Sequence, residues 1–244
     1  MKIALAAVGF LTNNLDYNFY KIKETVKKYA SQADLILFGE SFLQGFDCLT
    51  WDYSIYIDIA VSQDSSIIDE IRSLFKKYKV AVSFGYIEKD EDKLYSSQLT
   101  ISKDGEILDN FRRVSTGWKE PVADFHYVEG EGFGQFSYLE KTISVALCGD
   151  LWYAENCIQM ENLDSDIVLW PVYTDFDFKE WNESLKYEYA GQAQKCGSDI
   201  LYVNSHCLEK NSDNIARGGA CLFNEGKIVH ELLAGEEGVL IVEV

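Results

Sequence analysis

Basic residues and histidines are scarce in this chain, and the scarcity argues against two classes of protein. The 244 residues carry 22 Lys and Arg against 40 Asp and Glu, for a formal net charge of -18. A surface that binds nucleic acid is expected to be basic, so we expect no nucleic-acid partner. The three histidines lie far apart in the sequence and lack the spacing of a zinc site. We therefore expect neither a metal nor another cofactor.

Long apolar runs and paired cysteines are also missing. No apolar stretch approaches the length of a transmembrane helix, and residues 1–8 are too short for a signal-peptide core with its cleavage site. The six cysteines are scattered and form no C-x-x-C pair, which is typical of reduced thiols. The sequence therefore predicts a cytoplasmic protein with no membrane partner.

The residues that are present predict an α/β fold in a single domain, residues 1–244. Hydrophobic residues make up 47% of the chain, enough for a sizeable core. Apolar runs alternate with segments of helical spacing, and hairpin-like turns indicate mixed sheets. Helices are predicted over residues 13–30, from residue 64 or 65, and over 179–196. The main strands are predicted at 2–8, 34–38, 79–86, 94–102, 142–147, 167–170 and 200–203, with a charged turn over 88–93.

One cysteine stands where a reactive group is expected. Residues 142–147 form an apolar run that ends at Cys148, and Gly149 follows before residues that can begin a helix. A helix N-terminus favours negative charge and would lower the pKa of the thiol, so Cys148 is a candidate nucleophile. A small buried core residue is the alternative.

A carboxylate closes a second apolar run. Residues 35–38 are followed by Gly39 and Glu40. Ligands in α/β folds collect at the carboxyl ends of strands, and partial burial would raise the pKa of Glu40 as suits a general base. The alternative is a solvated strand end. His206 also follows a strand, but a lone histidine is more often structural.

Two blocks of sequence resemble the nitrilase, or carbon–nitrogen hydrolase, superfamily. The stretch ADLILFGESFLQGF at residues 33–46 is similar to the block around the family's glutamate. The stretch CGDLWYAE at residues 148–155 is similar to the block around its cysteine. The order of the later elements also agrees, so the resemblance covers essentially the whole chain.

This resemblance implies a fold and an activity. The fold is a four-layer αββα sandwich with mixed sheets, and the protein is expected to be a homodimer or a larger homo-oligomer. The family's triad is Glu, Lys and Cys, which implies Glu40 as general base and Cys148 as nucleophile. The implied reaction is hydrolysis of a small amide, ω-amide or carbamoyl substrate through a cysteine thioester, with an amidase favoured over a nitrilase.

The third member of the triad departs from the pattern. In direct register the lysine position reads Arg113, while Lys119 lies six residues further on and Glu120 falls near the family's second glutamate. Arginine supplies positive charge but cannot donate and recover a proton at ordinary pH. Either Arg113 has a modified role or Lys119 reaches the site. Otherwise the chain is a weak or inactive enzyme that serves as a binding or regulatory protein. An acyltransferase is a third alternative.

Smaller departures concern the surroundings of the predicted site. Gly39 replaces a proline that usually precedes the glutamate, and Gly149 replaces a bulkier residue, which leaves room beside the thiol. Tyr189 stands where the family has an arginine.

Aromatic residues near strand ends are candidates for a substrate-binding wall, although ordinary core packing is the alternative for each. The candidates are Trp118, Trp152, Tyr173 and also Trp170. Acidic residues that could hold a cationic group are Asp47, Asp52 and Asp175.

Overall fold

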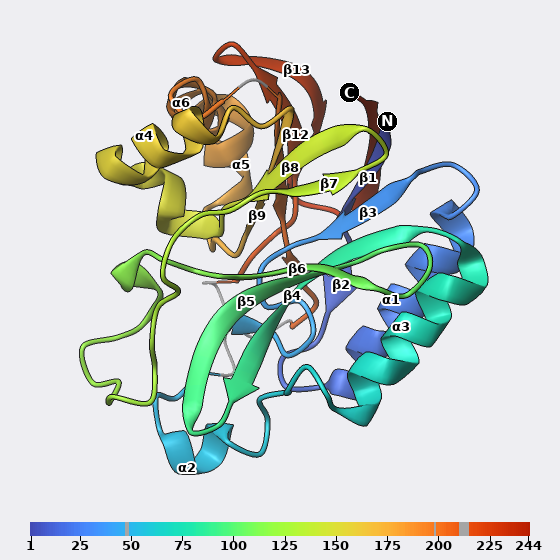
Figure 1. The fold of residues 1–244 in the computed structure, drawn as a ribbon. Helices are drawn as coiled ribbons and strands as arrows, with labels where there is room; N and C mark the ends of the chain where they lie inside the picture. Colours follow the sequence, from blue (N-terminus) through green and yellow to red (C-terminus); the bar gives the residue numbers. More distant parts are fainter. Residues whose placement is uncertain (47–48, 198, 210–214) are drawn as a thin grey trace.

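The computed structural model describes residues 1–46, 49–197, 199–209 and 215–244. Two six-stranded sheets face each other, and helices cover the outer face of each sheet (Figure 1). This is the predicted four-layer αββα sandwich.

The first sheet is mixed and has the order β14-β1-β3-β4-β5-β6. Strands β1, β3 and β4 run parallel, whereas β14, β5 and β6 pair antiparallel with their neighbours. The strands are β1 (Lys2–Ala7), β3 (Leu35–Phe38), β4 (Ala81–Asp90), β5 (Lys93–Ile101), β6 (Ile107–Arg112) and β14 (Gly238–Glu243).

The second sheet has the order β13-β12-β10-β9-β8-β7, with β8, β9 and β10 parallel. Its strands are β7 (Phe136–Tyr138), β8 (Lys141–Val145), β9 (Ile167–Val172), β10 (Asp199–Asn204), β12 (Ala220–Asn224) and β13 (Lys227–Leu232). Two short strands, β2 (Gly9–Phe10) and β11 (His206–Cys207), form a separate parallel pair.

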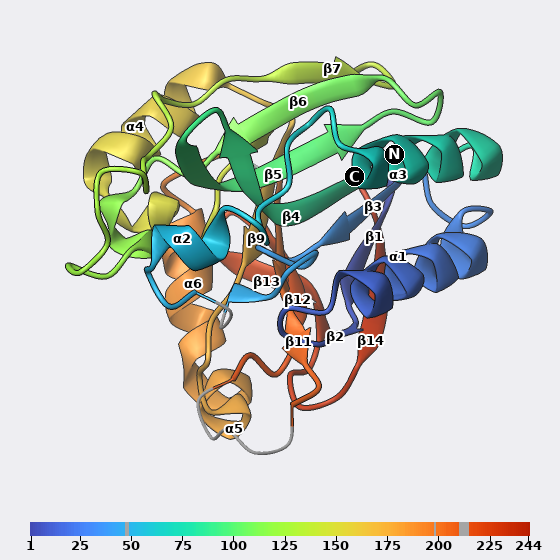
Figure 2. The same cartoon turned by 90° about the horizontal axis from the view of Figure 1, so that it is seen from below.

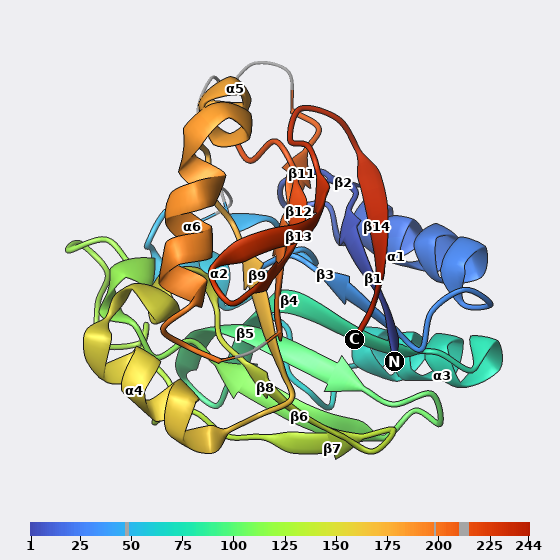
Figure 3. The ribbon, with the colours of Figure 1, turned by 90° about the horizontal axis from the view of Figure 1, so that it is seen from above.

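The helices divide between the two outer faces. Helices α1 (Leu15–Tyr29) and α3 (Ser66–Tyr78) lie side by side against the first sheet, and α4 (Ala154–Leu163) and α6 (Lys186–Ala193) lie on the far side, against the second (Figures 2 and 3). The predicted helix over 179–196 is divided, because α5 (Phe178–Glu180) leads through a π-helical turn (Trp181–Leu185) into α6. Short helical segments in the described part of the chain include α2 (Tyr53–Tyr56), η2 (Thr116–Trp118) and η3 (Cys148–Trp152).

The burial of strand β3 on both faces explains why its sequence is an unbroken apolar run. Leu35 and Leu37 pack between the two sheets, whereas Ile36 and Phe38 pack toward α1 and α3. Alternate residues of a strand point to opposite faces, so a strand that is covered on both faces needs a continuous apolar run. This packing fixes the strand end from which Glu40 extends.

Local signals placed several elements correctly. The Asn14 side chain accepts the N–H of Tyr17 and caps α1, and Ser65 precedes α3. The predicted charged turn over 88–93 is wrong at its start, because β4 continues to Asp90. Glu88 is buried within β4 and pairs with the Arg112 guanidinium at 2.8 Å. The ion pair explains how a charged residue can lie inside the sheet.

The ends of the chain and the cysteines complete the description. Strand β14 pairs with β1, so the two termini lie side by side (Figure 3). The five described cysteines are free thiols, and Cys48 lies outside the described residues. In the part of the chain that the structure describes, every helix is too short or too polar to cross a membrane.

Candidate active site

Strand ends from both sheets converge on one point. Glu40 follows β3, Arg113 follows β6, Cys148 follows β8 and Tyr173 follows β9. The sheets are joined here by main-chain bonds, since the N–H of Glu40 donates to the carbonyl of Val172 at 3.2 Å. Residues that are far apart in sequence therefore meet at the carboxyl edges of the strands, where α/β folds usually bind ligands.

Glu40 is held rigidly at this point. Its side chain is buried, and Oε1 accepts from Ser96 Oγ at 2.8 Å and from Arg113 Nη1 at 3.0 Å. Oε2 accepts the backbone N–H of Tyr173 at 3.2 Å. Each carboxylate oxygen therefore has a donor, as a buried charge requires.

A glycine on β4 allows the turn that carries Glu40 to approach the sheet. A Cβ on Gly85 would lie 2.2 Å from the backbone nitrogen of Ser41 and 2.6 Å from the carbonyl carbon of Glu40. Any side chain at position 85 would therefore push the Glu40 turn away from β4.

Cys148 occupies a strained position at the start of η3. Its φ is +42°, a backbone region that non-glycine residues rarely adopt and that often marks functional sites. Its carbonyl accepts from Trp170 Nε1 at 2.8 Å, and its thiol donates to the carbonyl of Tyr173 at 3.6 Å. The residue as a whole is partly exposed.

The expectation that a helix N-terminus lowers the pKa of this thiol is wrong. Burial raises the pKa of Cys148 to about 12, and the charge of Glu40 adds to the rise, whereas Arg113 opposes it. Segment η3 has only five residues, so its dipole is small beside these effects. The resting sulfur is therefore a protonated thiol beside a carboxylate.

Arg113 is the basic residue that the fold brings to this point. It is 6% exposed, and its Nε donates to Ser115 Oγ at 2.9 Å while Nη1 donates to Glu40. Burial disfavours the charged form, but the charges of Glu40, Cys148 and Asp150 outweigh burial and keep the pKa above its usual value. Among the described residues, Nη2 has no hydrogen-bond partner.

Asp150 connects the segment of Arg113 to the segment of Cys148. Its Oδ1 accepts the N–H of Ser115 at 2.7 Å and of Val114 at 3.2 Å, and its Oδ2 accepts the N–H of Leu147 at 2.9 Å. Burial raises the pKa of this carboxyl to about 6, against the opposing charge of Arg113. Sequence reasoning saw Asp150 only as part of the cysteine block and gave it no role.

Lys119 and Glu120 are placed differently from Arg113. Lys119 Nζ pairs with a Glu129 carboxylate oxygen at 2.7 Å and donates to the carbonyl of Tyr127 at 2.8 Å. Glu120 is exposed and makes no ion pair with any described residue. The structure therefore shows no contact of either residue with Glu40 or Cys148.

The predicted aromatic residues separate into two groups. Trp118 is buried in a cluster with Trp51 and Tyr127. Trp152 is 44% exposed at the end of η3, and the ring of Tyr173 stacks on Phe46 at 5.7 Å. Trp152 and Tyr173 thus lie on the segments that flank Cys148, whereas Trp118 is buried in a separate aromatic cluster.

Tyr189 is a site residue that sequence reasoning did not assign. Its ring stacks on Trp170 at 5.1 Å and meets Trp152 edge-on at 5.0 Å. Burial raises the pKa of Tyr189, and the charge of Cys148 raises it further. The signal was available, because Tyr189 stands where the resembling family has an arginine.

The acidic candidates are not part of this cluster. Asp52 caps α2 through a bond to the N–H of Ser54, and Asp175 is exposed. Asp47 lies outside the described residues.

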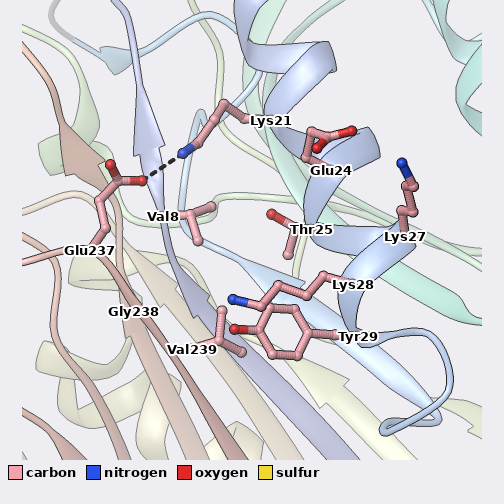
Figure 4. A pocket seen from close by; sticks show the side chains of 10 residues that line it. All are labelled: Val8, Lys21, Glu24, Thr25, Lys27, Lys28, Tyr29, Glu237, Gly238 and Val239. Carbon is pink, nitrogen blue, oxygen red and sulfur yellow. Dashed lines mark hydrogen bonds and ion pairs between the residues drawn. The ribbon is translucent and has the colours of Figure 1, made fainter.

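A separate hollow of about 630 Å³ lies between α1 and β14. Figure 4 shows its lining, where Lys21 pairs with Glu237 and the side chain of Lys28 lies beside the ring of Tyr29. None of its lining residues belongs to the cluster of Glu40, Arg113 and Cys148.

Comparison with known proteins defines the class of protein. The carbon-nitrogen hydrolase family model matches residues 2–244, so the chain belongs to this family, within the nitrilase superfamily. The solved amidase from Nesterenkonia sp. AN1 superposes with a TM-score of 0.79 at 20% identity, covering 100% of this chain and 92% of that one. At this identity the likeness shows the fold.

Two curated relatives are similar in sequence. A citrullinase of Francisella tularensis is 25% identical over 228 residues, which are 87% of this chain and 77% of the relative. An N-carbamoylputrescine amidase of Oryza sativa is 25% identical over 180 residues, covering 70% of this chain and 58% of the relative.

Proposed function

We propose that the protein hydrolyses the carbon–nitrogen bond of a small amide, ω-amide or carbamoyl compound through a cysteine thioester. One observation carries the proposal. Buried Glu40 is bound at once to Arg113 and to the N–H of Tyr173, and the carbonyl of the same Tyr173 accepts the thiol of Cys148. A base, a cation and a nucleophile are thus held in one small space.

The first half of the reaction begins with a protonated Cys148 thiol beside the Glu40 carboxylate. Because the pKa of Cys148 is raised, the sulfur has to lose its proton as it attacks, and the Glu40 carboxylate accepts that proton. Sγ bonds to the substrate carbonyl carbon and the carbonyl oxygen becomes an oxyanion. The nitrogen then leaves as ammonia or an amine, with the proton that Glu40 returns.

The second half reverses the roles. Glu40 takes a proton from water, the hydroxide oxygen bonds to the thioester carbon, and the sulfur leaves and recovers the proton from Glu40. An acid is released from an amide, and a carbamic acid from a carbamoyl compound. The thiol of Cys148 is regenerated.

Arg113 contributes charge to both halves. Its Nη1 is engaged by Glu40 and its Nε by Ser115, which leaves Nη2 as the donor for the developing oxyanion. Arginine remains charged at all ordinary pH values, so its role is electrostatic, with no proton transfer. The geometry supports Arg113 in the place of the family's lysine and gives no chemical step to Lys119 or Glu120.

The substrate class rests on two supports. The curated relatives include proteins named for citrulline and for N-carbamoylputrescine, both carbamoyl compounds. Trp152 and Tyr173 lie on the segments that flank Cys148, and Tyr189 contacts the ring of Trp152, so these aromatic residues are our candidates for contact with a small planar group. We assign Trp152 and Tyr173 to substrate contact and leave Trp118 to packing.

Residues 1–244 are proposed to act as a single domain, because both sheets share one central core. The cytoplasmic location and the homodimeric or larger state belong to the same proposal. Cell fractionation and analytical ultracentrifugation test them.

The decisive assay measures ammonia release from a panel of amides, ω-amides, carbamoyl compounds and nitriles. We expect turnover by the wild type and none by Cys148→Ala, and a covalent thioester should appear in mass spectra of the wild type alone. Equal, background-level release by both proteins across the panel, together with ligand-induced stabilisation of both, would favour a binding protein. Transfer of the acyl group to an added amine would identify an acyltransferase.

A further inference from the structure

A second glycine at the site has a different purpose from Gly85. Gly149 directly follows Cys148, and its φ lies outside the left-handed range that side chains avoid. Its backbone therefore does not require glycine. What the position lacks is space, because a Cβ there would lie 2.7 Å from Arg113 Nη2 and 3.8 Å from the guanidinium carbon.

The guanidinium that fills this space cannot easily move aside. Nε is bonded to Ser115 Oγ at 2.9 Å and Nη1 to Glu40 at 3.0 Å, so two of the three nitrogens are fixed. The rigid planar fork then directs Nη2 toward residue 149. A methyl group at this position would have to break one of these bonds or rotate the plane of the guanidinium.

We propose that Gly149 is a positioning residue that makes room for Arg113, so that an arginine, rather than a lysine, serves as the cation beside Cys148. The inference deepens the proposed function and rests on it for its catalytic meaning. The steric part does not depend on turnover. An ammonium group has no branch where Nη2 lies, so lysine at position 113 would tolerate a side chain at 149.

The consequence appears in the titration of the thiol. Arg113 lowers the pKa of Cys148, whereas burial and Glu40 raise it. By Coulomb's law at an effective dielectric constant of about 20, displacing the guanidinium by roughly 2 Å at short range would raise the pKa of the thiol by roughly one unit. Gly149→Ala should therefore slow alkylation of Cys148 about tenfold at a fixed pH below the thiol pKa.

The test is a double-mutant cycle of Gly149→Ala and Arg113→Lys, read out by the pH dependence of iodoacetamide labelling at Cys148, identified by mass spectrometry. We expect Gly149→Ala to slow labelling about tenfold beside Arg113 and less than twofold in the Arg113→Lys background. Gly191→Ala is the matched control. A Cβ at Gly191 meets nothing within 4 Å, so this substitution should leave labelling unchanged.

The outcomes separate this inference from the proposed function. The same factor for Gly149→Ala in both backgrounds would overturn the inference, even in an active hydrolase. Slower labelling in Gly149→Ala beside Arg113 but not in the Arg113→Lys background would support it, even if no substrate is turned over. Should Gly149→Ala fail to fold, recovery of folding in the double variant supports the inference and continued failure overturns it. If the enzyme is active, Gly149→Ala should lower kcat beside Arg113 and change it little in the Arg113→Lys background.

Discussion

Replacing Glu40 by glutamine should destabilise the protein as well as inactivate it. The substitution keeps the shape of the side chain and removes the charge that pairs with Arg113 at 3.0 Å, where both side chains are buried. Removing one partner of a buried ion pair costs about 3–5 kcal/mol, because the remaining charge has no counter-ion. Asp150 still acts on Arg113, so we expect the lower end of this range.

The measurement is urea unfolding of Glu40→Gln, Arg113→Met and the double variant. In a chain of this size, a loss of about 3 kcal/mol in the free energy of unfolding corresponds to a fall in Tm of roughly 6–12 °C. The double variant should be less destabilised than the sum of the single variants by more than about 1 kcal/mol, since it leaves no unpaired charge. Additivity within about 0.5 kcal/mol would refute the buried pair.

Glu40→Gln should also change the pKa of the Cys148 thiol. Glu40 raises the pKa of Cys148, whereas Arg113 lowers it, so Glu40→Gln should lower that pKa. The thiolate ultraviolet absorbance, followed against pH, measures this shift. An unchanged or higher pKa in the variant would mean that Glu40 does not act on the sulfur.

Three further substitutions or conditions test the assignment of roles. Lys119→Met should retain hydrolysis within about threefold, whereas Arg113→Met should lose about 100-fold or more, since Arg113 contacts Glu40 and Lys119 does not; equal losses in kcat/KM would contradict this. Hydrolysis should fall as pH drops through about 6. Burial raises the pKa of Asp150 to about 6, and its protonated carboxyl could no longer accept all its backbone N–H bonds; a kcat/KM profile flat through that pH would contradict it. Trp152→Ala should raise KM more than it lowers kcat, and an unchanged KM would remove Trp152 from the substrate wall.

Much of the fold could be predicted from local pattern. The continuous apolar run of β3 reflects burial on both faces, and the Asn14 cap and the apolar stripe of α3 follow from helix geometry. Glu88 was placed wrongly because a charged residue normally marks a turn. Its partner Arg112 lies 24 residues further along the chain and is brought to it only by the pairing of β4, β5 and β6.

Some residues of the candidate site could likewise be predicted from the sequence, and others could not. Glu40 and Cys148 could be picked out from sequence, because each closes an apolar run and each lies in a block that resembles the family. The partners Ser96 and Ser115 carry no such signal, and Asp150 lies in the cysteine block without any sign of the contacts that it makes. The bonds from Ser96 to Glu40 and from Ser115 to Asp150 join segments that are distant in the chain, and such common residue types give no indication of these contacts in the sequence.

The sequence by itself determined the family, the order of the elements and two of the three groups that meet at the strand ends. Only the tertiary structure showed which of Arg113 and Lys119 contacts Glu40, because this depends on which side chain the end of β6 directs toward Glu40 and on Lys119 being held by Glu129. It also decided the state of the Cys148 thiol. The pKa is set by burial and by the charges of Glu40 and Arg113, which come together only in the folded chain.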